Sequence, residues 1–124
     1  MISGEITITP KKLRFNYFQL LAFYNYDKVL VSQLYQSFLS QFPKDKKDLL
    51  IHFKNSDIKK VTKSLNKIKS FALNFQCSEL VADIVEQEKI ILSGKAPIEI
   101  KIYSILSKSQ ILLEMISAHQ EQAA

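Results

Sequence analysis

Three side chains have types suited to catalysis or metal binding: His52, His119 and Cys77, the only histidines and the only cysteine of the chain. A metal site or an activated nucleophile needs further ligands or a base at a suitable spacing. No cysteine and no second histidine lies at ligand spacing from either histidine on its own helix, and no histidine follows Cys77 three or four residues later. We therefore predict two ordinary surface or boundary histidines, a structural thiol, no metal site and no catalytic residue.

The other candidate for acid–base chemistry is a carboxylate cluster formed by Asp83, Glu86 and Glu88. We expect these side chains to keep their helix hydrated rather than to transfer protons. The sequence also lacks the HExxH, GxxxxGKS/T and GxSxG patterns of zinc proteases, phosphate-binding loops and serine hydrolases. These observations predict a protein that is not an enzyme and has no cofactor.

The composition narrows the fold class. The chain has 124 residues, 47% hydrophobic and 23% charged, which is typical of one globular domain with a single core. Two glycines and three prolines are too few for a compact all-β fold or a glycine-rich nucleotide loop. The single cysteine excludes an internal disulfide, and no long apolar run or leader pattern is present. We expect a soluble cytoplasmic protein that does not bind a membrane.

The positive charge is concentrated in one stretch of the chain. The net charge is +5, yet residues 44–69 alone contain nine lysines and three acids, a local charge of +6. Such a local patch favours a specific acidic partner surface over a general nucleic-acid coat. Aromatic side chains that could stack on bases are rare within it, so we do not expect nucleic acid as the partner.

Apolar residues at spacings of three and four predict helices from residue 13 onward. A short helix comes first, and a long one follows from a cap at Asn25 or Asp27 to about Phe53, continuing with a bend through Pro43. The apolar register of this long helix is expected along Leu30, Leu34, Ser37–Phe38 and Ser40–Gln41, widened by Val31, Tyr35 and Leu39.

Three further helices complete the expected fold. The third follows the turn 55–57 and has the most regular apolar stripe: Ile58, Val61, Leu65, Ile68, Ala72 and Phe75. The fourth is expected to be capped by Ser78 and to stop at Gly94, and the fifth to hold Pro97 in its first turn. We therefore predict an all-α fold: an antiparallel four-helix bundle preceded by a short N-terminal helix, over 13–118, with an arm at 1–12 and a frayed tail at 119–124.

Asn66 occupies an unusual place beside the stripe of the third helix. It follows Leu65, so its side chain points about 100° away, at the margin of the apolar face. Its neighbours one and two turns away are polar apart from one leucine: Lys59, Thr62, Lys63, Lys69, Ser70 and Leu73. Periodicity alone indicates a solvated face that keeps a bundle soluble.

The segment 65–75, which begins Leu-Asn-Lys-Ile-Lys-Ser-Phe-Ala, resembles the signature of the histidine phosphotransfer (HPt) domain. That signature reads roughly His-x-Leu-Lys-Gly-Ser, followed by a small or aromatic stretch and a helix ending in Leu-Glu. The segments 26–27, 38–43, 55–57, 79–80 and 86–88 also resemble their HPt counterparts. The resemblance covers about residues 15–118 and implies a helical bundle that works in two-component phosphorelays.

In this alignment Asn66 stands where HPt domains carry the phosphorylated histidine. Ile68 matches the apolar position and Lys69 the lysine that helps to hold the phosphoryl group, while Ser70 replaces a glycine. His52 does not replace the missing nucleophile, because no lysine lies three residues after it. An amide nitrogen is a poor nucleophile, since its lone pair is delocalised into the carbonyl group. The resemblance therefore implies a pseudo-HPt that binds without relaying phosphoryl groups.

The partner implied by the resemblance is a response-regulator receiver domain or a hybrid sensor kinase. The residues expected to bind it are Lys59, Thr62, Lys63, Asn66, Lys67, Lys69, Ser70 and Leu73. Two alternatives stay open: an active phosphotransfer domain whose histidine has been substituted, and an unrelated helical bundle that binds an acidic partner through its lysines. The apolar stretch 98–105 also leaves a homodimer open.

Overall fold

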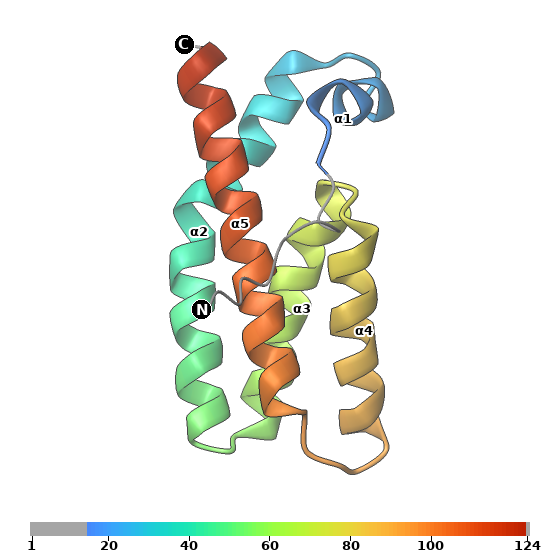
Figure 1. The fold of residues 1–124 in the computed structure, drawn as a ribbon, viewed down its shortest axis with the longest axis vertical. Helices are drawn as coiled ribbons and strands as arrows, with labels where there is room; N and C mark the ends of the chain where they lie inside the picture. The colour runs from blue at the N-terminus through green and yellow to red at the C-terminus, as the bar shows by residue number, and fades with distance from the viewer. Residues whose placement is uncertain (1–14, 124) are drawn as a thin grey trace, which may run out of the picture.

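The computed structural model describes residues 15–123, with side chains to residue 120, and the secondary structure of this part of the chain consists of helices joined by turns, without strands. Its elements, in chain order, are α1 (Tyr17–Phe23), α2 (Lys28–Lys54), α3 (Ile58–Asn74), α4 (Ser78–Leu92) and α5 (Glu99–Ala123) (Figure 1). The predicted all-α class is confirmed. The predicted arm at 1–12 lies outside the described residues, and α5 continues to Ala123, beyond residue 118, where we expected the bundle to end.

The four long helices, α2 to α5, lie side by side and give a bundle-like fold, as Figure 1 shows. Short turns join α2 to α3 and α3 to α4. The short helix α1 lies at the end of the assembly where α2 begins and α3 ends (Figure 1). None of the helices within residues 15–123 has the combination of length and apolarity required to cross a bilayer.

Aspartate side chains fix the start of the two helices that matter most for the site. Asp27 Oδ1 accepts a hydrogen bond from the Leu30 amide at 2.9 Å, and Asp57 Oδ1 accepts one from the Lys60 amide at 3.3 Å. Each carboxylate pairs a backbone N–H that has no partner within the first turn of its helix. Asp27, one of the two residues predicted as a cap, is therefore the N-cap of α2.

Two predicted helix starts are displaced. Ser78 is the first residue of α4, not its cap, because Cys77 holds the N-cap position and makes no side-chain capping bond. Pro97 precedes α5 and is buried, whereas we expected it inside the first turn. The predicted stop of α4 is confirmed: Gly94 has a φ of +88°, a left-handed conformation that glycine adopts without strain.

The long helix α2 runs through Pro43 without interruption from Lys28 to Lys54, as predicted. Its buried face consists of Val31, Tyr35, Phe38, Phe42, Asp45 and Leu49. The register predicted along Leu30 and Leu34 is therefore wrong by about one residue. At both places the neighbouring positions, Leu30 and Val31 or Leu34 and Tyr35, are apolar. The register that buries the aromatic rings of Tyr35 and Phe38 removes more apolar surface from water.

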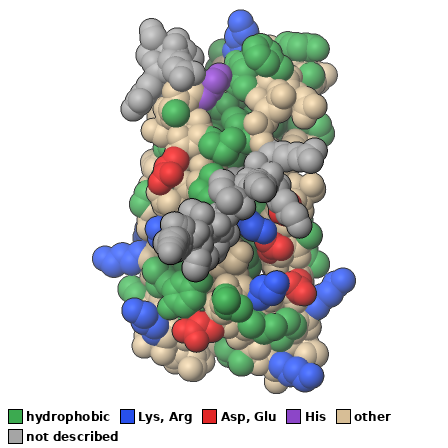
Figure 2. Space-filling model, in the orientation of Figure 1, with side chains coloured by type: hydrophobic (Ala, Val, Ile, Leu, Met, Phe, Trp, Pro, Cys, Tyr) green, Lys and Arg blue, Asp and Glu red, His purple; other side chains and the backbone are tan. Residues whose placement is uncertain are grey.

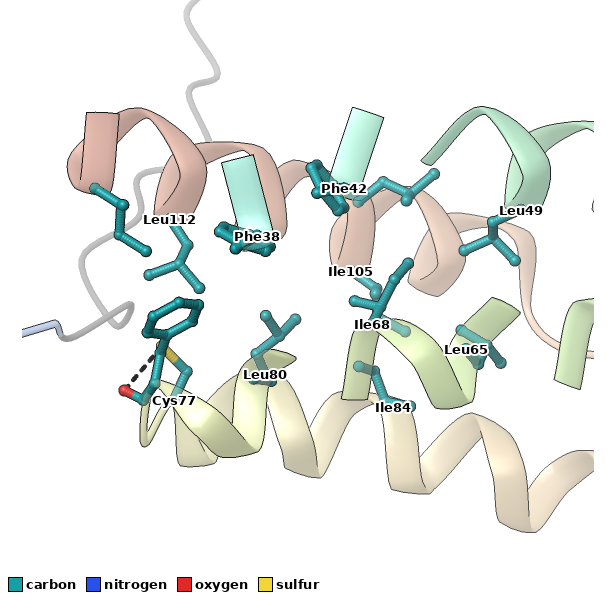
Figure 3. Packing of buried hydrophobic residues seen from close by; sticks show 14 of the residues in the cluster. Phe38, Phe42, Leu49, Leu65, Ile68, Cys77, Leu80, Ile84, Ile105 and Leu112 are labelled. Carbon is teal, nitrogen blue, oxygen red and sulfur yellow. Dashed lines mark hydrogen bonds between the residues drawn. The ribbon is translucent and has the colours of Figure 1, made fainter. Parts of the chain in front are cut away.

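The core lies where the four long helices meet. Figure 3 shows Phe38 and Phe42 of α2, Leu65 and Ile68 of α3, Leu80 and Ile84 of α4, and Ile105 and Leu112 of α5 directed toward one another. The predicted stripe of α3 is confirmed from Val61 to Phe75, with Ile58 only half-buried. The buried apolar positions of α5 are Ile102, Ile105, Leu106, Leu112 and Ile116, whereas Ile98, just before this helix, is exposed.

Four polar residues of the described chain are buried, Asp45, Ser64, Gln87 and Ser109, and two of them bind across or along helices through longer side chains. Gln87 of α4 accepts a hydrogen bond from the Ile98 amide at 2.8 Å, which ties the segment before α5 to α4. Asp45 of α2 is 1% exposed, and its Oδ1 accepts a hydrogen bond from Gln41 at 3.1 Å. Buried polar groups with such partners fix the positions of the elements that carry them.

Two leucines of α3 allow the importance of this core to be measured. Leu65 is fully buried, whereas Leu73 is 51% exposed. We expect Leu65→Ala to lower the free energy of unfolding by about 2–5 kcal/mol, because it leaves a cavity. Leu73→Ala, the matched control, should cost about 1 kcal/mol or less. Urea unfolding monitored by circular dichroism measures both, and equal losses would contradict the assignment of faces on α3.

Candidate functional site

The exposed side of α3 is the surface that the sequence singled out. Leu65 is fully buried and the next residue, Asn66, is exposed, because one residue corresponds to about 100° of rotation around the helix. We call the exposed positions on this side the Asn66 face: Lys59, Lys63, Asn66, Ser70 and Leu73. These residues recur every three or four positions and form one row along α3.

The remaining predicted residues lie at the edges of this row. Lys67 is exposed, whereas Thr62 and Lys69 are half-buried. The Thr62 hydroxyl donates to the Ile58 carbonyl at 2.9 Å, and the Ser70 hydroxyl donates to the Asn66 carbonyl at 3.1 Å. Both hydroxyls are therefore used within α3, and Thr62 contributes less to the exposed surface than we expected.

The side-chain amide of Asn66 is positioned for an outside partner. Its residue is exposed, and the only hydrogen bond made by Asn66 outside the helical backbone, among the described residues, is the one that its carbonyl accepts from Ser70. The amide offers two N–H donors and one oxygen acceptor. This amide can therefore bind hydrogen-bonding groups of a partner.

Lys69 is not available in the same way. Its Nζ lies 2.8 Å from Glu88 Oε1 on α4, and the two side chains are only 24% and 18% exposed. The ion pair therefore joins α3 to α4 and neutralises most of the charge that Lys69 would present to an anion. Of the predicted basic residues, Lys69 is the one that the structure uses to hold the fold together.

The other lysines keep their charge at the surface. Lys59 and Lys63 form no ion pair within the described residues. Lys67 lies on the side of α3 that faces α2, where its charge acts on Asp48. The hydrogen bond from Lys44 lowers the pKa of Asp48 most, and the charges of Lys44, His52 and Lys67 add to this. The Asn66 face and its α2 edge therefore present three largely uncompensated lysines.

Four exposed apolar side chains at the α1–α2 junction were not anticipated from the sequence. We call them the apolar corner: Phe18, Phe23, Tyr26 and Val29. Tyr26 and Phe23 are 70% and 58% exposed, and Figure 2 shows apolar side chains on the surface at this end of the molecule. The available signal was aromatic density, because residues 15–26 contain six aromatic residues, more than a short helix can bury.

The end of α1, which carries Phe23 of the apolar corner, lies beside the C-terminal end of α3. The Tyr24 hydroxyl donates to the Asn74 carbonyl at 2.7 Å, and Phe23 lines the same surface hollow as Gln76. Leu73, at the end of the Asn66 face, is therefore close to an apolar surface contributed by α1. A partner that covers Asn66 from this end meets both amide and apolar groups. Exposed apolar patches of this kind are typical of interaction sites.

The candidate residues for metal binding and catalysis lie apart from this face. Both histidines are half-buried, and Cys77 is buried at the start of α4. Within the described residues no group of three or more histidine, cysteine or carboxylate side chains is arranged to hold a metal ion.

The acidic cluster of α4 has a different role from the one we expected. Lys108 of α5 donates to Asp83 at 2.6 Å and lies 3.6 Å from Glu79, while Glu88 pairs with Lys69. Only Glu86 is fully exposed, as a hydrating side chain would be. The expectation is wrong for Asp83 and Glu88, because lysines of the neighbouring helices reach these carboxylates.

The Cys77 thiol gives a prediction that depends on pH. The thiol is 2% exposed, and burial, aided by the charge of Glu79, raises its pKa to about 11. We expect almost no reaction with a disulfide reagent at pH 7.5 in the folded protein, and an increasing rate as the pH rises toward 11. In urea the thiol should react as an ordinary cysteine, and an equally fast reaction of the folded protein would contradict its burial.

Comparison with known proteins identifies no relative of this chain. The chain matches no protein-family model, and no curated protein and no solved structure is detectably similar to it.

Proposed function

We propose that this protein is a pseudo-HPt: an antiparallel four-helix bundle that binds a response-regulator receiver domain through the Asn66 face and does not carry a phosphoryl group. The observation that carries the proposal is the position of Asn66. Its amide is exposed in the middle of a lysine-flanked row, on the helix whose sequence resembles the HPt signature and at the position of the phosphorylated histidine.

The chemistry of the amide supports binding without transfer. In a relay, an imidazole nitrogen attacks the phosphorus atom of an aspartyl phosphate, the bond to the aspartate oxygen breaks, and the phosphoryl group later moves to a second aspartate. The nitrogen of an amide has no available lone pair for this attack. Asn66 can still donate and accept hydrogen bonds at the same position, and it is small enough to approach a concave partner surface.

The ion pair of Lys69 supports the same conclusion. The HPt resemblance gives this lysine the task of holding the phosphoryl group, but here Glu88 lies 2.8 Å from its ammonium group. Moving Lys69 toward a phosphoryl group would break this contact and leave a half-buried carboxylate without its partner, which is costly. The position of the histidine therefore lacks a nucleophile, and the lysine that would hold the phosphoryl group is engaged with Glu88.

The surface around Asn66 suits an acidic partner. A receiver domain, as the resemblance implies, presents a pocket with a cluster of acidic residues. Lys59, Lys63 and Lys67 complement such a rim and accelerate the encounter electrostatically. Leu73 and the apolar corner supply area that loses water when the partner is bound. The lysines at one end of the surface thus attract the partner, and the apolar side chains at the other end provide contact area.

The absence of transfer can be tested directly. After incubation with a phosphorylated receiver domain and Mg²⁺, we expect no acid-labile phosphate on this chain, because Asn66 cannot attack the acyl phosphate. Asn66→His should acquire acid-labile label if the scaffold is that of an HPt domain. Phosphate analysis by gel and mass spectrometry distinguishes the two chains. Acid-labile phosphate on the unmodified chain would overturn the proposal.

The docking surface can be tested by charge placement. Asn66→Lys puts a bulky, hydrated cation at the centre of the proposed interface, and we expect it to weaken receiver binding about tenfold or more. Gln33→Lys is the matched control, because Gln33 is exposed on the side of α2 opposite the buried Val31 and Tyr35. Titration calorimetry with receiver domains from the organism that produces this protein measures the affinities of the two variants.

The outcomes separate the proposal from its alternative. Leu73→Ala should also weaken receiver binding while leaving the fold stable, since the side chain is half exposed. Equal affinities for Asn66→Lys and Gln33→Lys would place the interface elsewhere and contradict the proposal. If no receiver binds and DNA binds with a steep dependence on salt, the lysines serve an unrelated bundle that recognises nucleic acid.

A further inference from the structure

A cavity of about 370 Å³ lies between the start of α2 and the end of α5, a volume typical of small-molecule sites. Its walls include Tyr17 of α1, Lys28, Ser32 and Tyr35 of α2, and His119 of α5. All of its lining residues within the described part of the chain belong to these helices, so the cavity is separate from the Asn66 face.

Four buried side-chain polar atoms lack a hydrogen-bond partner among the described residues. Asp45 Oδ2 and Gln87 Nε2 belong to residues outside this cavity, and the other two belong to residues that line it. They are the hydroxyl oxygen of Tyr35, a side chain that is 3% exposed, and Nδ1 of His119. Buried polar atoms in folded proteins almost always have a partner, because an unsatisfied donor or acceptor destabilises the fold. These two atoms therefore indicate a place where a ligand supplies polar groups.

The aromatic rings around these atoms are held in fixed positions. The ring of His119 lies 4.2 Å from that of Tyr17 between centroids, with a tilt of 36°. The same imidazole meets the ring of Tyr35 edge-on, at 5.7 Å and 87°. Contacts in this range restrict ring rotation, so the hydroxyl and the imidazole do not need to be reorganised when a ligand arrives.

The electrostatics of the cavity favour an anion. Lys28 is the charged residue among the described lining residues, and no carboxylate accompanies it there. Burial raises the pKa of the Tyr35 hydroxyl, and Tyr17 raises it further. Tyr35 therefore remains a neutral O–H donor, and Ser32 adds a second hydroxyl. A cation and several donors suit a negatively charged group, whereas Val31 and the tyrosine rings suit an apolar body.

We propose that this cavity binds a small organic anion, with its carboxylate facing Lys28 and the Tyr35 hydroxyl and its apolar body lying against Val31 and the aromatic rings. Its described lining shares no residue with the Asn66 face or the apolar corner, so the proposal does not rest on receiver binding. Its ligand is recognised by the combination of one negative charge and a compact apolar group.

The proposal can be tested with benzoate as the probe. We expect saturable changes in the amide ¹H–¹⁵N resonances of Ser32, Tyr35 and His119 when benzoate is added to the full chain. Benzamide, a neutral molecule of nearly the same shape, and inorganic phosphate, an anion without an apolar body, should each bind about tenfold more weakly. Their comparison separates recognition of charge from recognition of the ring.

Variants identify the groups responsible. Lys28→Gln and Tyr35→Phe should each weaken benzoate binding about tenfold, through loss of the charge and of the donor respectively. Lys47→Gln removes an exposed lysine of α2 outside the cavity and should change nothing. Because Lys28 is exposed, its substitution leaves the fold intact. No saturable shift with benzoate, equal binding of benzamide or phosphate, or equal affinities for Lys28→Gln and Lys47→Gln would overturn the proposal.

Discussion

The structure depends above all on the burial of one apolar stripe of α3. Val61, Leu65, Ile68 and Ala72 are each no more than 1% exposed, and they pack against residues from the other long helices. Rotating α3 by a single residue would expose these side chains and bury Asn66 and Lys69, or Lys60 and Lys67 in the other direction, which costs far more than any contact that the exposed face could gain. The orientation of Asn66 toward solvent is thus imposed by the residues on the opposite side of the same helix.

Cross-helix ion pairs divide the lysines into two groups. Lys69 and Lys108 are half-buried and bind carboxylates of α4, so their charge serves the contacts of α4 with α3 and α5. Lys59 and Lys63 lie on the exposed row and are not neutralised within the described residues. The basic stretch of the sequence therefore contributes a narrower positive surface than its local charge of +6 suggests. On α3, the exposed lysines without an ion pair among the described residues are Lys59, Lys63 and Lys67.

The success of sequence-based prediction differed between helices for identifiable reasons. The face of α3 could be predicted because its apolar residues recur at spacings of three and four with lysines between them. On α2 the pairs Leu30–Val31 and Leu34–Tyr35 are apolar on adjacent positions, so periodicity does not decide the register, and the packing of the aromatic rings decides it instead. The burial of Gln87 follows from a bond to the backbone of Ile98, eleven residues away, which no local pattern indicates.

For the candidate site, too, the exposed face of a single helix could be predicted, but its contacts with other helices could not. The exposure of Asn66 follows from the stripe, but the ion pair between Lys69 and Glu88 joins residues nineteen apart and depends on how α3 and α4 pack. The apolar corner likewise becomes part of the surface beside Leu73 only because Tyr24 places α1 against the end of α3. Contacts between helices, rather than the helices themselves, were the part that the sequence left undetermined.

The two ends of the proposed docking surface make physically different contributions. Attraction between exposed lysines and an acidic partner acts over about 8–10 Å and weakens as salt is added, so it governs mainly the rate of association. Burial of Leu73 and the apolar corner acts only at contact and is largely insensitive to salt, so it governs mainly the rate of dissociation. A partner with the correct charge but no apolar surface would associate and dissociate rapidly. Selectivity for a receiver domain therefore requires both ends of the surface. Asn66 lies between them, and its hydrogen bonds fix how the partner is aligned on α3.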